Sequence, residues 1–197
     1  MLSKTRFDGS IGEDSRKNLK LVVFGRIEDN ISYNLQKSLK SFFISIKEDL
    51  GFLPSINLIK RPEPEISNLQ NSGVMLNGEL SKIHGKIVLG VTDLGIYDDF
   101  VQRNIFGYGG NGTGLLSTYR FRQREDGMEK LKERLCKEII KILGLACGIS
   151  CNEKYCILTY HRFVVDLDVN NDVCPNCREK MIREIKYYME VDDEQSE

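Results

Sequence analysis

The sequence predicts one α/β (α+β) domain, because short apolar segments typical of strands alternate along the chain with amphipathic segments typical of helices. A β-branched apolar run covers residues 18–25, and apolar stripes of helical period cover residues 31–50 and 127–145. A chain of 197 residues is long enough for one sizeable core. This order of elements favours a mostly parallel or mixed sheet packed on helices.

The first half of the chain is expected to contain two strands and one long helix. Residues 18–25 (NLKLVVFG) and 55–60 (SINLIK) have the apolar, β-branched composition of strands. Between them, apolar residues recur every three or four positions and mark the core-facing side of a helix. Asp29 or Asn30 is the expected N-terminal cap, and Gly51 the expected left-handed stop.

The middle of the chain is expected to add two more strands. Residues 71–86 have a turn-like composition, and residues 86–93 (KIVLGVTD) predict a buried strand. Residues 114–122 (GLLSTYRFR) alternate in the manner of another strand. The glycine-rich segment 106–114 lacks the Gly-Lys-Ser/Thr of a phosphate-binding loop and does not open a predicted helix, so we interpret it as a flexible connector.

Both ends of the chain are expected to be mobile tails. Residues 1–17 are polar and residues 191–197 are acidic, which leaves residues 18–190 as the folded domain. The first residues lack the apolar stretch of a secretory signal, and no apolar run reaches the roughly 18 to 20 residues of a membrane span. We therefore predict a cytoplasmic protein that does not contact membranes.

Charge gives little support for a nucleic-acid partner. The formal net charge is -1, and the basic residues that follow the last cysteine are interleaved with Glu179 and Glu184. The basic residues concerned are Arg178, Lys180, Arg183 and Lys186.

Four of the six cysteines have the spacing of a metal site. Cys151 and Cys156 are separated by four residues, and Cys174 and Cys177 by two, with seventeen residues between the pairs. Four thiolates can surround a zinc ion tetrahedrally and leave no position for water, so this zinc would be structural and would hold the segment 147–185 in place. Two disulfides or an iron–sulfur cluster are the alternatives, although a reducing compartment disfavours disulfides.

The other two cysteines, Cys136 and Cys147, lie in or near the second helix. Neither has a histidine close in sequence, so we interpret both as buried thiols of the core.

Four stretches of the sequence together are similar to a known family. They are KIVLGVTDLGIYDDF with NIFGYG, GLLSTYRFR, KEIIKILGL, and CNEKYCIL with CPNC, and the last two are specific. The family that they resemble, over roughly residues 18 to 185, is the archaemetzincins, which are metzincin-type zinc peptidases. The resemblance implies a single metzincin-like domain with a twisted mixed sheet, and an edge strand formed by residues 114–122.

The family's hallmark is a helix reading H-E-x-x-H-x-x-G-x-x-H, in which three histidines hold a catalytic zinc and the glutamate acts as general base. At the corresponding positions, Lys137 and Lys141 replace the first two histidines. Glu138 stands at the general-base position, and Gly144 at the turning glycine. The resemblance therefore extends to the catalytic helix but not to its metal ligands.

The third histidine and the methionine below the family's site are also replaced. The third position is Cys147 when counted from the helix and Ser150 when counted back from the cysteine cluster. Leu158 stands at the methionine position, and the segment between the two cysteine pairs is two residues shorter than in the family pattern. The chain contains two histidines, His84 and His161, so a three-histidine site cannot form elsewhere.

These replacements predict that the catalytic zinc is absent and that one structural zinc remains. Lysine is protonated at neutral pH, and two ammonium groups would repel a divalent cation. Without a zinc-bound water, Glu138 has no proton to abstract as general base. We then expect Lys137, Glu138 and Lys141 to form a solvated helix face with a Glu–Lys pair.

The sequence thus favours a proteolytically inactive archaemetzincin-like protein with a structural zinc. Its cleft would bind a peptide or a protein partner along the predicted edge strand, residues 114–122. The alternative is a zinc metallopeptidase with altered ligands, in which Glu138, Cys147 and His161 bind the metal.

Overall fold

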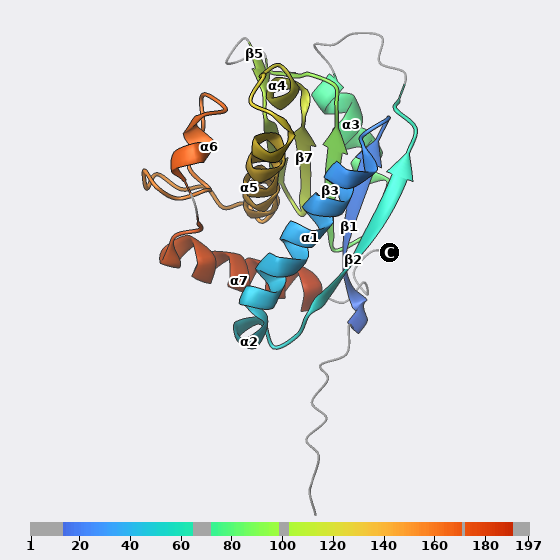
Figure 1. Cartoon of the computed structure of the whole chain (residues 1–197). Coiled ribbons are helices and arrows are strands. Elements are labelled where there is room, and N and C mark those ends of the chain that lie inside the picture. Colours follow the sequence, from blue (N-terminus) through green and yellow to red (C-terminus); the bar gives the residue numbers. More distant parts are fainter. Residues whose placement is uncertain (1–13, 65–71, 99–102, 171, 191–197) are drawn as a thin grey trace, which may run out of the picture.

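The structure is a computed structural model that describes residues 14–64, 72–98, 103–170 and 172–190. Most of the predicted N-terminal tail and the whole acidic C-terminal tail lie outside these ranges. The described chain forms a five-stranded mixed sheet with strand order β2-β1-β3-β7-β6, flanked by helices (Figure 1). The sheet strands are β1 (Asp14–Phe24), β2 (Pro54–Arg61), β3 (Ile87–Thr92), β6 (Gly107–Gly110) and β7 (Thr113–Ser117).

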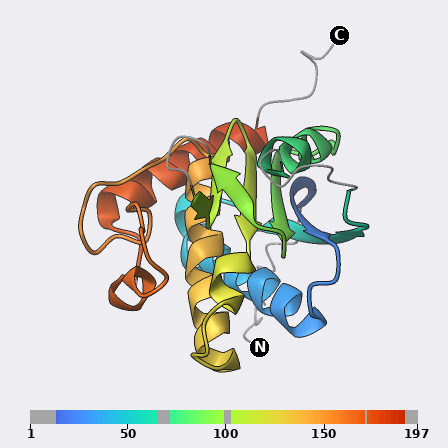
Figure 2. The same cartoon turned by 90° about the horizontal axis from the view of Figure 1, so that it is seen from above.

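The helices cover both faces of this sheet, as the view in Figure 2 shows. The larger core lies between the sheet and the side that carries α1, α5 and α7, and a smaller core lies between the sheet and α3. Strands β4 (Ile96–Asp98) and β5 (Arg103–Ile105) form a separate antiparallel pair. The helices are α1 (Asp29–Ser45), α2 (Lys47–Leu50), α3 (Ser72–Ser81), α4 (Tyr119–Arg122), α5 (Met128–Ala146), α6 (Asp166–Val169) and α7 (Pro175–Glu190).

The N-terminal half largely follows the prediction. Strand β1 pairs in parallel with β2 and β3, and it begins four residues earlier than expected. Gly51 ends α2 in the left-handed conformation with φ 79°, as its position predicts. The predicted cap is wrong: Glu28 is the N-cap of α1 without a side-chain cap bond, and Asp29 already belongs to the helix.

The turn-like segment 71–86 contains a helix, α3, which corrects the prediction. Leu76 and Leu80 are fully buried one turn apart, and they pack on the smaller core with Val22 and Val88 from the sheet. The tertiary contacts therefore stabilise a helix that its glycines and polar residues disfavour locally.

The segment 114–122 is not an edge strand. Strand β7 ends at Ser117, the residues that follow form α4, and β7 lies inside the sheet between β3 and β6. The edge strand is β6, which comes from the glycine-rich segment that we had interpreted as a connector. Asn111 and Gly112 form its two-residue turn with φ 52° and 75°, a conformation that favours the Asn-Gly pair.

Strand β6 packs directly against the helix that carries the family motif. A Cβ atom on Gly109 would lie 2.6 Å from the backbone nitrogen of Ala146 in α5, so only glycine allows this approach. Helix α5 itself is confirmed, with buried Leu135, Ile139 and Ile142 facing the core. None of the described helices combines the length and the hydrophobicity that crossing a membrane requires.

Candidate functional site

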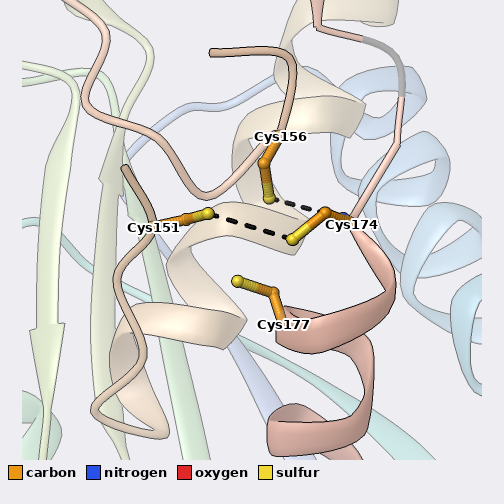
Figure 3. A group of neighbouring side chains, drawn as sticks. All are labelled: Cys151, Cys156, Cys174 and Cys177. Carbon is orange, nitrogen blue, oxygen red and sulfur yellow. Dashed lines mark hydrogen bonds between the residues drawn. The ribbon is translucent and has the colours of Figure 1, made fainter. Parts of the chain in front are cut away.

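The four cysteines predicted to bind a metal converge at one point (Figure 3). Cys151 and Cys156 come from the loop after α5, Cys174 directly precedes α7, and Cys177 lies in the first turn of α7. Their Sγ atoms all lie within 4.8 Å of one another, and all six cysteines of the chain are free thiols. The four cysteines thus lie together, as their spacing predicts, and could share one metal ion.

The cluster suits a tetrahedral zinc ion. Zn–S bonds of about 2.3 Å place the sulfurs of a tetrahedral site about 3.8 Å apart, and the Sγ atoms of Cys151 and Cys174 are 3.9 Å apart. Backbone N–H groups of Glu153 and Cys174 donate to the sulfurs of Cys151 and Cys156, at 3.3 and 3.4 Å. Burial raises the pKa of Cys174 to about 11, and a bound cation would favour its thiolate form.

The metal cluster joins the C-terminal segment to the core. Cys156 and Cys177 are buried, and so are Met181, Ile185 and Met189 along the inner face of α7. This helix was not predicted, although these apolar residues recur every four positions and Pro175 stands at its start.

The motif residues of α5 do not form a solvated face, which corrects the prediction. Glu138 is 1% exposed and Lys141 is 6% exposed. The Nζ atom of Lys141 lies 3.6 Å from Oε1 of Glu138 and 3.3 Å from Nδ1 of His161. His161 is also buried, with its Nε2 atom 2.7 Å from the side-chain nitrogen of Asn170.

The carboxylate of Glu138 is held ionised inside the protein. Burial alone would raise the pKa of Glu138, but the charge of Lys141 and the contact with His161 outweigh burial and lower it. The Oε2 atom of Glu138 lies 3.6 Å from Nδ1 of His161 and has no hydrogen-bond partner. One acceptor of a buried carboxylate is thus left unsatisfied.

These residues lie in a cleft of about 370 Å³ between the edge strand β6, helix α5 and the loop that follows α5. Leu158, at the family's methionine position, lines the cleft. It packs against Gly144, because a Cβ atom added to Gly144 would lie 2.6 Å from the Cδ2 atom of Leu158. The polar residues that line it are Asp98, Arg103, Tyr108, Arg120, Glu138, Lys141, Ser150, Asn152, Tyr160 and His161.

Lys137 and Lys141 point in different directions. The Nζ atom of Lys137 donates to the carbonyl oxygen of Leu167 at 2.9 Å and pairs with Glu133 at 2.9 Å, so Lys137 contacts the α6 segment. Of the two candidates for the third ligand position, Ser150 lines the cleft, whereas the thiol of Cys147 is buried near Glu184 of α7.

The segment that carries α6 is held to α5 by an ion pair. The Arg134 guanidinium, whose side chain is 5% exposed, donates from Nε and Nη2 to the two carboxylate oxygens of Asp168, at 2.9 and 2.7 Å. These bonds lower the pKa of Asp168 to about 2. Because this segment also carries His161 and Asn170, the ion pair helps to position one wall of the cleft.

The Asp168 pair predicts a specific pH dependence. The pKa of this carboxyl is about 2 in the folded protein and about 3.9 when unfolded. Its stabilisation is therefore complete above about pH 4 and is lost as the pH falls toward about 2. Allowing for solvent screening, we expect the free energy of unfolding of the wild type, measured in urea at pH 6, to exceed that of Asp168→Asn by about 1–2 kcal/mol. The difference should shrink steadily as the pH falls; a difference that is independent of pH would contradict the assignment.

Comparisons with known proteins agree with the fold. The archaemetzincin of Methanocaldococcus jannaschii is 32% identical over 106 residues, which are 48% of this chain and 57% of that protein. The crystal structure of archaemetzincin from Methanopyrus kandleri matches with a TM-score of 0.66 and 20% identity, and covers 87% of this chain and 97% of that one. No protein-family model matches the chain.

Two further solved structures are similar. A zinc-dependent peptidase from Methanocorpusculum labreanum matches with a TM-score of 0.65 and 16% identity, over 83% of this chain and 100% of that one. Archaemetzincin from Archaeoglobus fulgidus, complexed with malonate, matches with a TM-score of 0.62 and 20% identity, over 82% of this chain and 99% of that one.

The chain has the α/β fold of these archaemetzincin and peptidase structures, together with four cysteines that could share one metal ion. Within that fold class the chain is archaemetzincin-like, which confirms the resemblance predicted from its motifs.

Proposed function

We propose that this protein keeps the archaemetzincin scaffold and one structural zinc, but binds an extended peptide in its cleft without hydrolysing it. The observation that carries the proposal is the buried ammonium group of Lys141, 3.6 Å from the Glu138 carboxylate. Glu138 stands at the general-base position of the family motif, so the neighbouring charge there is a fixed lysine rather than a metal-bound water.

The donors at this place do not suit a catalytic zinc. Zinc binds neutral imidazoles, thiolates and carboxylates, and a protonated lysine offers it no lone pair. Both ring nitrogens of His161 already contact side-chain nitrogens, those of Lys141 and Asn170. Within the described ranges, the four cysteines are the one group of three or more ligand residues close enough to share a metal.

The edge strand supports peptide binding. The Ser117 N–H donates to the Phe106 carbonyl at 2.7 Å, and hydrogen-bonded positions alternate along an antiparallel pair. The backbone groups of Gly107 and Gly109 therefore point away from β7, and no strand of the described chain pairs with that side of β6. An extended peptide can add there as a further strand, with the cleft beside it.

One observation favours the alternative, a zinc metallopeptidase with altered ligands. Glu138 and His161 lie 3.6 Å apart and supply a carboxylate and an imidazole. A third ligand would have to come from elsewhere, because Cys147 is buried near α7 instead. We therefore rank this function second.

A peptidase assay separates the two functions. The zinc-loaded protein is incubated with a mixture of unstructured peptides, with and without a zinc chelator, and the products are identified by mass spectrometry. We expect no cleavage that the chelator abolishes. Chelator-sensitive cleavage that is also lost in Glu138→Gln would contradict the proposal, whereas cleavage that persists in this variant identifies a contaminating protease.

A further inference from the structure

We propose that the cleft recognises a carboxylate group of its peptide ligand through Arg103 and Arg120. This inference rests on the proposed peptide binding and adds the chemical group that selects the ligand. It follows from the position of the two arginines, from the balance of charge in the cleft, and from the strand beside them.

The two arginines line the same cleft, and contacts with neighbouring groups hold each guanidinium in place. Arg103 donates to the Tyr160 hydroxyl, and the Arg120 guanidinium lies 4.1 Å from the centre of the Phe106 ring and donates to the Arg162 carbonyl at 3.0 Å. Both arginines are half-buried and line the cleft. Each keeps donors beyond these contacts, because a guanidinium carries five N–H groups.

Within the described parts of the chain, neither arginine forms an ion pair with a carboxylate. The Nε atom of Arg103 is buried without a hydrogen-bond partner. Burial lowers the pKa of Arg120 and the charge of Arg103 lowers it further, while the charges of Glu138 and Asp166 offset only part of this. An anion placed between them would relieve both costs.

The carboxylates of the cleft leave room for such an anion. Three cations line it, Arg103, Arg120 and Lys141, against the carboxylates of Asp98 and Glu138. Glu138 is already engaged by Lys141 and His161 at its buried end. Asp166, which also acts on Arg120, accepts backbone N–H bonds at 2.8 Å from Arg162 and Phe163. Among the residues that line the cleft, the cations therefore outnumber the carboxylates by one.

The position along β6 connects the anion to a peptide. Arg120 lies over Phe106, which directly precedes β6, so the cationic end of the cleft is at the start of that strand. A peptide that pairs with β6 and places its C-terminal carboxylate there runs antiparallel to β6, whereas an acidic side chain can be placed there by a peptide of either direction. The carboxylate belongs either to the end of the peptide or to an acidic side chain, since guanidinium binds both in the same way.

The test uses three acetylated peptides on the whole zinc-loaded protein: tetra-alanine with a free carboxylate, the same peptide as an amide, and an amide in which the third alanine is aspartate. Binding is followed by NMR, through the Nε–H signals of the arginines and the backbone amides of Gly107 and Gly109. The variants are Arg103→Gln and Arg120→Gln. Arg183→Gln is the control, because its side chain is exposed and pairs with Glu184 on α7.

We expect a peptide with a carboxylate to bind at least about tenfold more tightly than the neutral amide, the size of one charge-assisted bond. The carboxylate peptide that binds shows whether the carboxylate comes from the end of the peptide or from a side chain. Each of the variants Arg103→Gln and Arg120→Gln should remove the preference for the carboxylate peptide over the amide, and Arg183→Gln should keep it. If all three peptides bind equally and shift the backbone amide signals of Gly107 and Gly109, the carboxylate inference is wrong but the proposed function stands. Binding of none of them, or tighter binding of a thymidine oligonucleotide at the arginines, would overturn both.

Discussion

Replacing Cys177 by serine is expected to destabilise the protein by about 5 kcal/mol or more at neutral pH. Serine does not supply a thiolate, and the free energy of a structural zinc site is largely folding free energy. Because Cys177 lies in the first turn of α7, the loss should first release α7 and the loop of residues 147–170. Urea unfolding followed by circular dichroism, with zinc present throughout, measures the difference.

Cys136→Ala is the matched control. Its thiol lies outside the metal cluster and is half-buried, with one weak contact of 3.6 Å to the Asn34 carbonyl. We expect a loss of about 1 kcal/mol, typical of a small change in a packed region. If Cys177→Ser were no less stable than this control, the zinc would not stabilise the C-terminal segment.

The second large effect is expected for Lys141→Met, which leaves the Glu138 carboxylate buried beside His161 at 3.6 Å, with the charge of Arg120 beyond ion-pair distance. Removing one member of a buried ion pair typically costs about 3–5 kcal/mol, because the other charge stays without compensation. Urea unfolding should show a loss of that size. The double variant Glu138→Gln/Lys141→Met removes both charges and should regain most of it.

Lys132→Met is the control on the same helix. Lys132 pairs with Glu129, whose side chain is 91% exposed, and exposed pairs contribute less than about 1 kcal/mol. Equal effects of Lys132→Met and Lys141→Met would mean that the Lys141 pair behaves as a surface pair, which would contradict the account of the cleft.

The elements that depend on local pattern were predicted best. Strand β3 and helix α5 have unbroken apolar signals, and the structure contains both close to the expected bounds. The helix α3 was missed because its glycines weaken the local signal, while Leu76 and Leu80 gain their burial from the sheet. The order of strands, which makes β6 the edge, follows from pairings that a sequence pattern does not contain.

The cysteine cluster and the cleft also differ in how well the sequence predicts them. The spacing of the cysteines predicted the metal cluster, because short loops bring each pair together and tetrahedral zinc requires four thiolates. The burial of Glu138 and Lys141 was not predicted. The loop that covers them lies around His161, some twenty residues later in the chain. Arg103 and Arg120 were not predicted at all, although Arg120 is one of the two arginines in GLLSTYRFR.

The central claim is that the protein binds one zinc at the cysteine cluster and none in the cleft, and native mass spectrometry of protein purified without added zinc tests it most directly. We predict one zinc per wild-type chain, and none bound stably in a variant with both Cys174→Ser and Cys177→Ser. A second zinc in the wild type, retained in that variant and lost in His161→Ala, would contradict the claim and would support a catalytic metal beside Glu138.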